Sequence, residues 1–219
     1  MKILKITLVA IISSLLMIVS SNALEGRIGV AAGYVNIEAS GTETLKDSSK
    51  KASKTVDENT LIPSIFAEIA MDNGLGLGIE HVPASADIGT ESRADDDAET
   101  SGGNKASAEI DGLTSIYLIK TFENGFFVKA GQTSTTVKTK EVLGTGSTYK
   151  DVDIDGMLIG LGMHKTKDSG VFYRISGEYT DYDSLKLTSE VADAVSGTRN
   201  VIDADVDTMA LKFSIGKAF

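Results

Sequence analysis

The chain has no cysteine and only two prolines, and each shortage excludes or disfavours particular structures and sites. Without cysteine there is no disulfide framework, no lipoprotein anchor, no thiol nucleophile and no cysteine metal site. Beyond the N-terminus there is also no apolar run long enough for a spanning helix. Together with the 22 glycines, this composition favours strands over spanning helices.

Positive charge is scarce as well, since 21 Lys and Arg residues stand against 31 Asp and Glu residues, a formal net charge of −10. Nucleic-acid binding needs a basic patch, so the sequence predicts no nucleic-acid partner. In an exported protein, acidic charge more often serves solubility and tolerance of divalent ions than one specific partner.

The N-terminus has the three parts of a secretory signal peptide. Lys2 and Lys5 precede an apolar stretch, and Ser21 and Ala23 put small residues at the −3 and −1 positions. An uncleaved membrane anchor is the alternative, but the stretch is shorter than the roughly 20 apolar residues that a spanning helix needs. The sequence therefore predicts a cleaved signal peptide, residues 1–23, and one mature domain, residues 24–219.

Apolar residues in the mature chain alternate with small or polar ones, which is the period of a β-strand. The expected strands are centred on residues 27–34, 65–70, 75–80, 108–121, 126–131, 157–164, 171–180 and 207–219. A strand of about ten residues matches a tilted bilayer crossing. The alternation predicts an all-β fold: an antiparallel up-and-down transmembrane β-barrel of about eight strands.

The alternation also predicts which side chains share a face. It is least regular from about Ala108 to Thr121, where we place Leu113, Tyr117 and Ile119 on the apolar face. Aromatic residues near strand ends are expected to anchor at the lipid headgroups. They are Tyr34, Tyr117, Tyr173, Tyr179, Tyr182, Phe126 and Phe219.

The connections alternate in length. Three are short turns of residues that accept a positive φ or bond their own backbone: 72–74, 123–125 and 167–170. Four are long and polar, and we expect loops at about 40–59, 84–105, 138–151 and 186–204. Short turns at one end and long loops at the other are typical of outer-membrane barrels, with the loops outside the cell.

These features resemble the small eight-stranded outer-membrane β-barrels, which include the membrane domain of outer membrane protein A and the opacity-type surface proteins. The last strand is similar to the signal that the barrel-assembly machinery of this family reads. Its outward residues are Met209, Leu211, Phe213, Ile215 and Phe219. The resemblance implies a monomer in the bacterial outer membrane, with outer-membrane lipids, the barrel-assembly machinery and periplasmic chaperones as partners.

If the apolar face meets lipid, the opposite face brings seven charged residues into the lumen. They are Arg27, Glu68, Glu80, Lys129, Arg174, Glu178 and Lys212. A barrel of eight strands is barely wide enough for side chains, so these groups are expected to pair. The paired network either fills the lumen or, as the alternative, forms an ion pathway that opens when partners are exchanged.

Catalytic and metal sites are not expected. His81 and His164 are the two histidines, and the topology puts them at opposite ends of the barrel, so neither a shared site nor a His81–Ser85 pair is favoured. Asp95-Asp96-Asp97, near Glu91 and Glu99, lacks the spacing of an EF-hand and is interpreted as a solvated acidic loop. The glycine-rich segment 144–147 lacks the lysine and helix of a phosphate site. We expect no cofactor.

The sequence thus predicts a non-enzymatic outer-membrane barrel with an envelope or surface-interaction role carried by exposed loops. The extracellular ligand of these loops, if any, is unknown. Two alternatives stay open: a narrow porin-like pore for ions or small solutes, and a periplasmic lipocalin-like binding barrel with its apolar face inside. Lys217 falls on the lipid-facing side, where its ammonium group must snorkel to the headgroups.

Overall fold

The computed structural model describes residues 24–44, 51–93, 104–142, 148–190 and 199–219, and they form one antiparallel sheet. The strands are β1 (Leu24–Thr44), β2 (Lys51–Met71), β3 (Leu75–His81), β4 (Ala86–Arg93), β5 (Asn104–Thr121), β6 (Phe126–Val142), β7 (Val152–Thr166), β8 (Val171–Tyr182), β9 (Leu185–Thr188) and β10 (Val201–Ala218). Among these residues no helix is long and apolar enough to cross a membrane.

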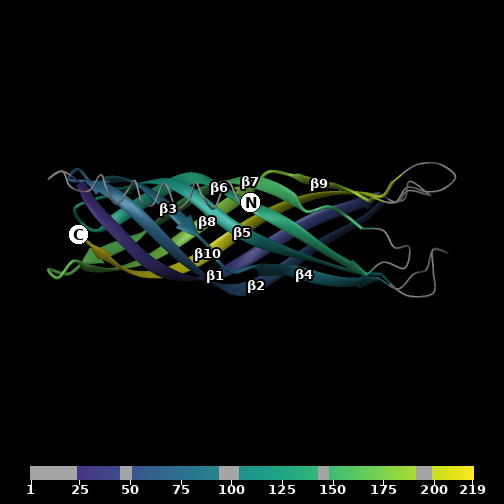
Figure 1. The fold of residues 1–219 in the computed structure, drawn as a ribbon, viewed down its shortest axis with the longest axis horizontal. Coiled ribbons are helices and arrows are strands. Elements are labelled where there is room, and N and C mark those ends of the chain that lie inside the picture. The colour runs from purple at the N-terminus through teal and green to yellow at the C-terminus, as the bar shows by residue number, and fades with distance from the viewer. Residues whose placement is uncertain (1–23, 45–50, 94–103, 143–147, 191–198) are drawn as a thin grey trace.

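The sheet closes into a barrel because β1 pairs with β2 on one side and with β10 on the other. β3 and β4 both pair with β5, and β8 and β9 both pair with β10, so the ring has eight strand positions. The strands run obliquely to the long axis of the barrel (Figure 1). The predicted all-β, eight-stranded antiparallel barrel is confirmed.

Three tight turns define one end of the barrel, called the turn end below. In each turn a glycine N–H donates to the carbonyl three residues earlier, at Gly74, Gly125 and Gly170. All three glycines have a positive φ of 79° to 84°, which residues with a side chain rarely adopt. The short turns predicted from the sequence are confirmed, and the opposite end, from which the long connections leave, is called the loop end.

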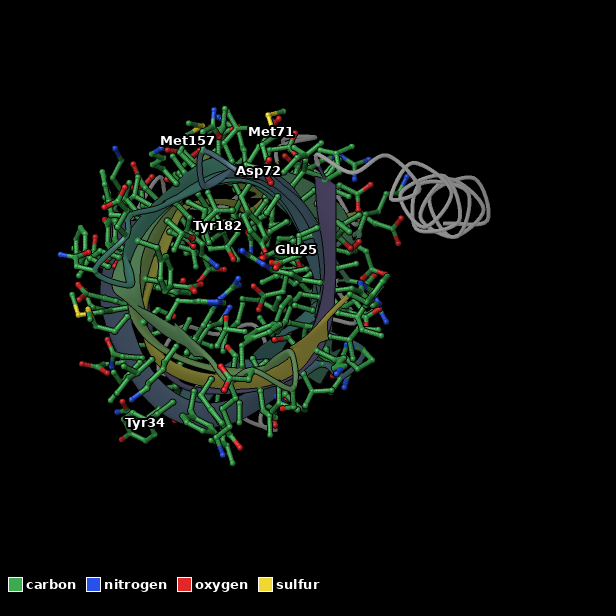
Figure 2. The ribbon with its side chains drawn as sticks, turned by 90° about the vertical axis from the view of Figure 1, so that its left-hand side faces the viewer. Glu25, Tyr34, Met71, Asp72, Met157 and Tyr182 are labelled. Atoms are coloured by element: carbon green, nitrogen blue, oxygen red, sulfur yellow. The ribbon has the colours of Figure 1, made fainter. Side chains whose placement is uncertain are left out.

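The outer surface near the turn end is an apolar belt. Val30, Leu61, Leu118, Ile159 and Leu211 are each more than half exposed. Figure 2 shows Tyr34 and Met157 outside the ring, and Tyr182 within it. A soluble barrel would bury such residues, so this surface is made to face lipid.

Toward the loop end the outward face of the sheet becomes polar and the inward face becomes apolar. On β1 the outward residues change from Val30 and Tyr34 to Asn36 and Glu38, while Val35 and Ile37 become buried inside. The outer half of the barrel therefore has an apolar interior. This core contains Val35, Ile37, Ala86, Ile88, Ile110, Val137, Tyr149, Ile154, Tyr182, Leu185, Leu187 and Val206.

The four predicted loops are too long, because strands extend into each of them. β1 runs on to Thr44, β2 starts at Lys51, β5 starts at Asn104 and β6 extends to Val142. These segments look like loops because their apolar residues are few, but hydroxyl pairs join them across strands. Ser40 and Thr55 are hydrogen-bonded at 2.9 Å, and Thr42 and Ser53 at 2.8 Å.

The predicted face of β5 is also wrong. Tyr117 and Ile119 are buried inside the barrel, whereas Ile116 and Leu118 are 49% and 57% exposed outside. A bulge between Asp111 and Thr114 shifts the register, and Gly112 within it has a φ of 69°. One extra residue reverses the alternation that follows, so the irregular sequence pattern concealed the true face.

Candidate functional site in the barrel lumen

The seven predicted lumen charges all lie on inner faces, and they come from six strands: β1, β2, β3, β6, β8 and β10. Glu68, Glu80, Lys129, Arg174 and Glu178 are each less than 9% exposed. Their contacts divide six of the seven into two groups, called the arginine cluster and the lysine cluster below. Arg27 lies at the edge of the first group.

The arginine cluster consists of Arg174, Glu68, Tyr117 and His164. Nη1 and Nη2 of Arg174 donate to the two carboxylate oxygens of Glu68 at 2.5 and 2.6 Å. Nε of Arg174 donates to Nδ1 of His164 at 2.8 Å, and the Tyr117 hydroxyl donates to Glu68 at 2.8 Å. Paired N–H groups on a carboxylate are the strongest ion-pair geometry that arginine forms.

Three phenylalanines surround the guanidinium group of Arg174. Its Cζ lies 5.5 Å from the ring centres of Phe66 and Phe127, and 4.9 Å from that of Phe172. Aromatic faces attract a cation within about 6 Å. The rings exclude water from the pair while they compensate part of the lost hydration of Arg174.

Glycines on neighbouring strands make room for these inward rings. A Cβ on Gly78 would lie 2.4 Å from the Tyr117 ring, and one on Gly216 would lie 2.3 Å from the Phe172 ring. Gly29 and Gly162 stand in the same relation to Phe66 and Phe127. Each large inward ring therefore lies over a glycine, which lets an eight-stranded lumen hold several aromatic side chains.

The lysine cluster consists of Glu80, Glu178, Lys129 and Lys212. Glu80 lies 3.3 Å from Nζ of Lys129 and 2.5 Å from Nζ of Lys212. Glu178 contacts the same two ammonium groups at 2.6 and 2.9 Å. Each carboxylate is therefore shared by both cations, and the cluster is neutral overall.

Further hydrogen bonds complete this cluster. The Ser64 hydroxyl donates to Glu80 at 2.7 Å, and the Ser176 hydroxyl donates to Glu178 at 3.1 Å. A single uncompensated charge here would cost several kcal/mol. The cavity between the two clusters measures only about 20 Å³, which holds roughly one water molecule. At this level the lumen is filled.

Arg27 has weaker partners than the other lumen charges. Its Nε donates to Glu25 at 2.5 Å, while its Nη1 lies 3.8 Å from Glu68 and makes no hydrogen bond. It lines an opening of about 710 Å³ at the turn end, together with Lys120 and Glu123. Arg27 therefore marks the place where the lumen meets solvent.

The two histidines lie on different strands and opposite faces of the wall. His81, at the end of β3, bonds the Thr114 hydroxyl at 2.9 Å. His164 faces inward near the turn end of β7. Among the described residues no three His, Asp or Glu side chains gather as metal ligands. Asp95-Asp96-Asp97, Glu99 and the segment 144–147 lie outside the described residues.

The outward residues proposed as an assembly signal form one exposed row on β10 and the residue after it. Met209, Leu211, Phe213, Ile215 and Phe219 are 63%, 59%, 55%, 41% and 51% exposed. The ammonium group of Lys217, in the same row, donates a hydrogen bond to the Ser169 carbonyl oxygen at the neighbouring turn. Its charge thus reaches the end of the barrel rather than the apolar belt.

Five of the seven expected anchoring aromatics are either clearly exposed or clearly buried, while Phe126 and Tyr173 are partly exposed. Tyr34, Tyr179 and Phe219 are exposed on the outer surface, as predicted for lipid-facing positions. Tyr117 and Tyr182, by contrast, are 3% and 5% exposed and lie inside the barrel, so their predicted anchoring role is wrong. The bulge in β5 explains Tyr117, and the exchange of faces in the outer half explains Tyr182.

Sequence reasoning missed the Phe66, Phe127 and Phe172 rings and Tyr117 as parts of this site. A signal for them is present in the sequence, because Gly78 and Gly131 both pair with Tyr117 across the sheet. An inward glycine leaves space that a cross-strand neighbour must fill. Glycines that share the face of the charged residues therefore point to inward aromatics.

On the outer half, ion pairs lie on the outward surface. The Lys140 ammonium group donates to Glu109, and this bond holds the pKa of Glu109 below its usual range. Asp111 lies 2.6 Å from Nζ of Lys138 and raises the pKa of that lysine. Both pairs are on β5 and β6 beyond the apolar belt, where water screens them.

Comparison with known proteins finds similarity at the level of structure only. No family model and no curated protein sequence matches the chain. OprG, an outer membrane protein of Pseudomonas aeruginosa, is 12% identical with a TM-score of 0.60, over 90% of this chain and 96% of its own. Ail of Yersinia pestis is 11% identical with a TM-score of 0.45, over 89% and 99% of the two chains.

The outer membrane protease OmpT of Escherichia coli is 9% identical with a TM-score of 0.47, over 91% of this chain and 98% of its own. OprG is a bacterial outer-membrane protein, and the apolar belt of this chain agrees with that location. The closed ring, the outward apolar belt and the likeness to OprG lead to one conclusion. The chain has the fold of the small outer-membrane β-barrels.

Proposed function

We propose that the protein is a non-enzymatic barrel of the bacterial outer membrane, with a structural or surface-interaction role in the envelope. The observation that supports this role is the filled interior: two neutral ion clusters occupy the lumen, and an apolar core continues above them. Such a cylinder is built for rigidity rather than transport. The barrel wall would hold its outer half, whose outward residues are polar, above the membrane surface.

The proposal includes export and assembly steps that follow from the sequence. A signal peptide is removed after Ala23, and the barrel-assembly machinery reads the outward row from Met209 to Phe219. Periplasmic chaperones carry the unfolded chain, because the belt residues cannot be buried before insertion. The mature chain works as a monomer, since a closed barrel leaves no strand edge in the membrane to recruit a second copy.

Refolding of residues 24–219 into lipid vesicles tests the proposal. A band that migrates differently with and without boiling, together with a β-rich circular dichroism spectrum, is expected of a membrane barrel. Single-channel recording on the same preparation should then give no steady conductance. A chain that folds as a soluble monomer without lipid would overturn the membrane location and favour the lipocalin-like alternative.

A narrow pore is the second candidate, and the lysine cluster is the observation that favours it. Because Glu80 and Glu178 each contact both Lys129 and Lys212, the partners can be exchanged without leaving a charge unpaired. Glu178→Gln removes one shared carboxylate and should change any conductance that such an exchange produces. Glu38→Gln, on the outward surface of β1, is the matched control.

Catalysis is not part of the proposal. His81 bonds the Thr114 hydroxyl, and His164 bonds Arg174 and the Thr166 hydroxyl. In the described contacts neither imidazole is bonded to a carboxylate that would orient it as a general base. The lipocalin-like alternative needs an apolar interior at the level of the belt. There, however, Leu211 and Ile159 point outward and the charges point inward.

A further inference from the structure

The hydrogen bond between Arg174 and His164 requires one protonation state of the imidazole. Nε of Arg174 is always protonated, so Nδ1 of His164 must accept and cannot carry a proton. The remaining nitrogen, Nε2, lies 2.7 Å from the Thr166 hydroxyl and carries the ring proton. The neutral Nε2–H tautomer therefore fits this site, and the imidazolium form does not.

The ring is held in place but remains accessible to water. It stacks on Phe172 with the ring centres 5.0 Å apart, so it cannot turn away from Arg174 without losing that contact. His164 lines a depression of about 590 Å³ at the turn end, next to Glu123 and Asn124, whose other walls include the belt residues Met163 and Ile175. The imidazole is itself only partly buried, so solvent protons can reach it from the turn end.

Protonation of His164 would cost Nδ1 the lone pair that accepts the Arg174 hydrogen bond. The surrounding charges oppose protonation further. Arg174 on β8 and Arg27 on β1 repel a protonated His164, and Glu68 on β2 is the carboxylate that attracts it. Glu68 is already engaged by both Nη atoms of Arg174 and by the Tyr117 hydroxyl of β5. Lys165 and Glu123, beside the ring at this depression, are exposed to water and are screened.

We propose that the His164–Arg174 hydrogen bond is a pH-sensitive latch that fixes Arg174 in the lumen at neutral pH and is released by acid. Protonation of Nδ1 removes the acceptor and places a cation against a guanidinium group. Arg174 must then move or lose its fixed orientation, which loosens the cage of Phe66, Phe127 and Phe172 around it.

The turn end faces the periplasm in an outer-membrane barrel. Because a protonated His164 loses the Arg174 hydrogen bond and meets two arginines, release needs stronger acid than a free histidine does, and the latch responds only to marked acidification. The inference goes beyond the proposed function, because it concerns a response of the lumen to pH and holds whether or not the lumen conducts.

The test uses the mature chain refolded in lipid or detergent, so folding is established at neutral pH first. Nitrogen chemical shifts of the imidazoles report the tautomer directly, and His164 should show an unprotonated Nδ1 at about pH 7.5. The unfolding rate in denaturant should then rise by about tenfold or more between about pH 7.5 and about pH 4, the order expected when a hydrogen bond to a charged group is lost.

Two substitutions separate the latch from general acid effects. His164→Gln offers an amide oxygen that accepts from Arg174 but does not titrate, so its unfolding rate should change little with pH. His81→Gln removes the other histidine of the chain and should keep the full acid response. A proton on Nδ1 of His164 at neutral pH, or an undiminished acid response in His164→Gln, would overturn the proposal.

Discussion

Arg174 and Glu68 are 106 residues apart in the sequence, yet their side chains form two parallel hydrogen bonds inside the barrel. They come from β8 and β2, which are not neighbours in the sheet. The pair therefore crosses the lumen and joins opposite parts of the wall. This cross-connection and the lysine cluster give the barrel interior a fixed arrangement.

Glu68→Gln should be strongly destabilising. It leaves the guanidinium group of Arg174 buried without a counter-charge, and loss of one member of a buried pair typically costs about 3–5 kcal/mol. The free energy of unfolding in urea, measured on the vesicle-inserted barrel, reports the change. Glu123→Gln in an exposed turn should stay within about 0.5 kcal/mol of the wild type. Equal stability of the two variants would contradict the importance of the pair.

Gly78→Ala should destabilise the barrel because the new Cβ would lie 2.4 Å from the Tyr117 ring. Overpacking of this kind costs about 1–3 kcal/mol. Gly177→Ala is a matched control, since its Cβ would meet nothing within 4 Å. Both glycines are in strands, so a loss confined to Gly78→Ala, measured by urea unfolding, separates the steric effect from backbone propensity.

Leu211→Arg should impair insertion. The side chain of Leu211 is 59% exposed on the apolar belt, and an arginine facing lipid near the midplane of the bilayer costs about 2–4 kcal/mol. The fraction of protein that becomes heat-modifiable in vesicles is the measurement. Ser40→Arg, on the outward surface of the outer half, should insert as the wild type does. Normal insertion of both variants would show that Leu211 does not face lipid and that the apolar belt is wrongly assigned.

Lys140→Gln should raise the pKa of Glu109 toward its ordinary value. The bond from the Lys140 ammonium group is the largest cause of the lowered pKa, and a hydrogen bond from Ser85 adds to it. Because the pKa is lower in the folded state, the pair stabilises the fold above the ordinary carboxyl pKa and loses this contribution as the pH falls. Carbon NMR titration of the carboxyl group measures the shift, and Lys186→Gln should leave it unchanged.

Much of the barrel could be predicted from local sequence. The alternation on β1, β7, β8 and β10 predicted both the strands and their faces, because a one-residue shift would bring every lipid-facing side chain inside. The turn residues at Gly74, Gly125 and Gly170 predicted the tight connections. These features depend on neighbours in the chain, which a sequence shows directly.

Other features depend on contacts across the barrel. The inward charges were visible in the sequence, but the bidentate partner of Arg174 depends on how the strands are ordered and staggered around the ring. On β5 the bulge at Gly112 reversed the expected faces. The strand extensions were missed because, beyond Tyr34 on β1, the apolar residues lie on the inward face instead of the outward one. The outward apolar alternation that marks a strand in the sequence therefore ends there.

That exchange of faces sets the vertical position of the protein in the bilayer. If the barrel sank, Asp207, Asp181 and Asp155 would follow Met209, Tyr179 and Met157 into hydrocarbon. If it rose, Met209 and Met157 would leave lipid for water, and Lys217 would be drawn toward hydrocarbon. Both displacements are opposed on several strands at the same level, so the amino-acid sequence itself specifies the depth at which the barrel rests.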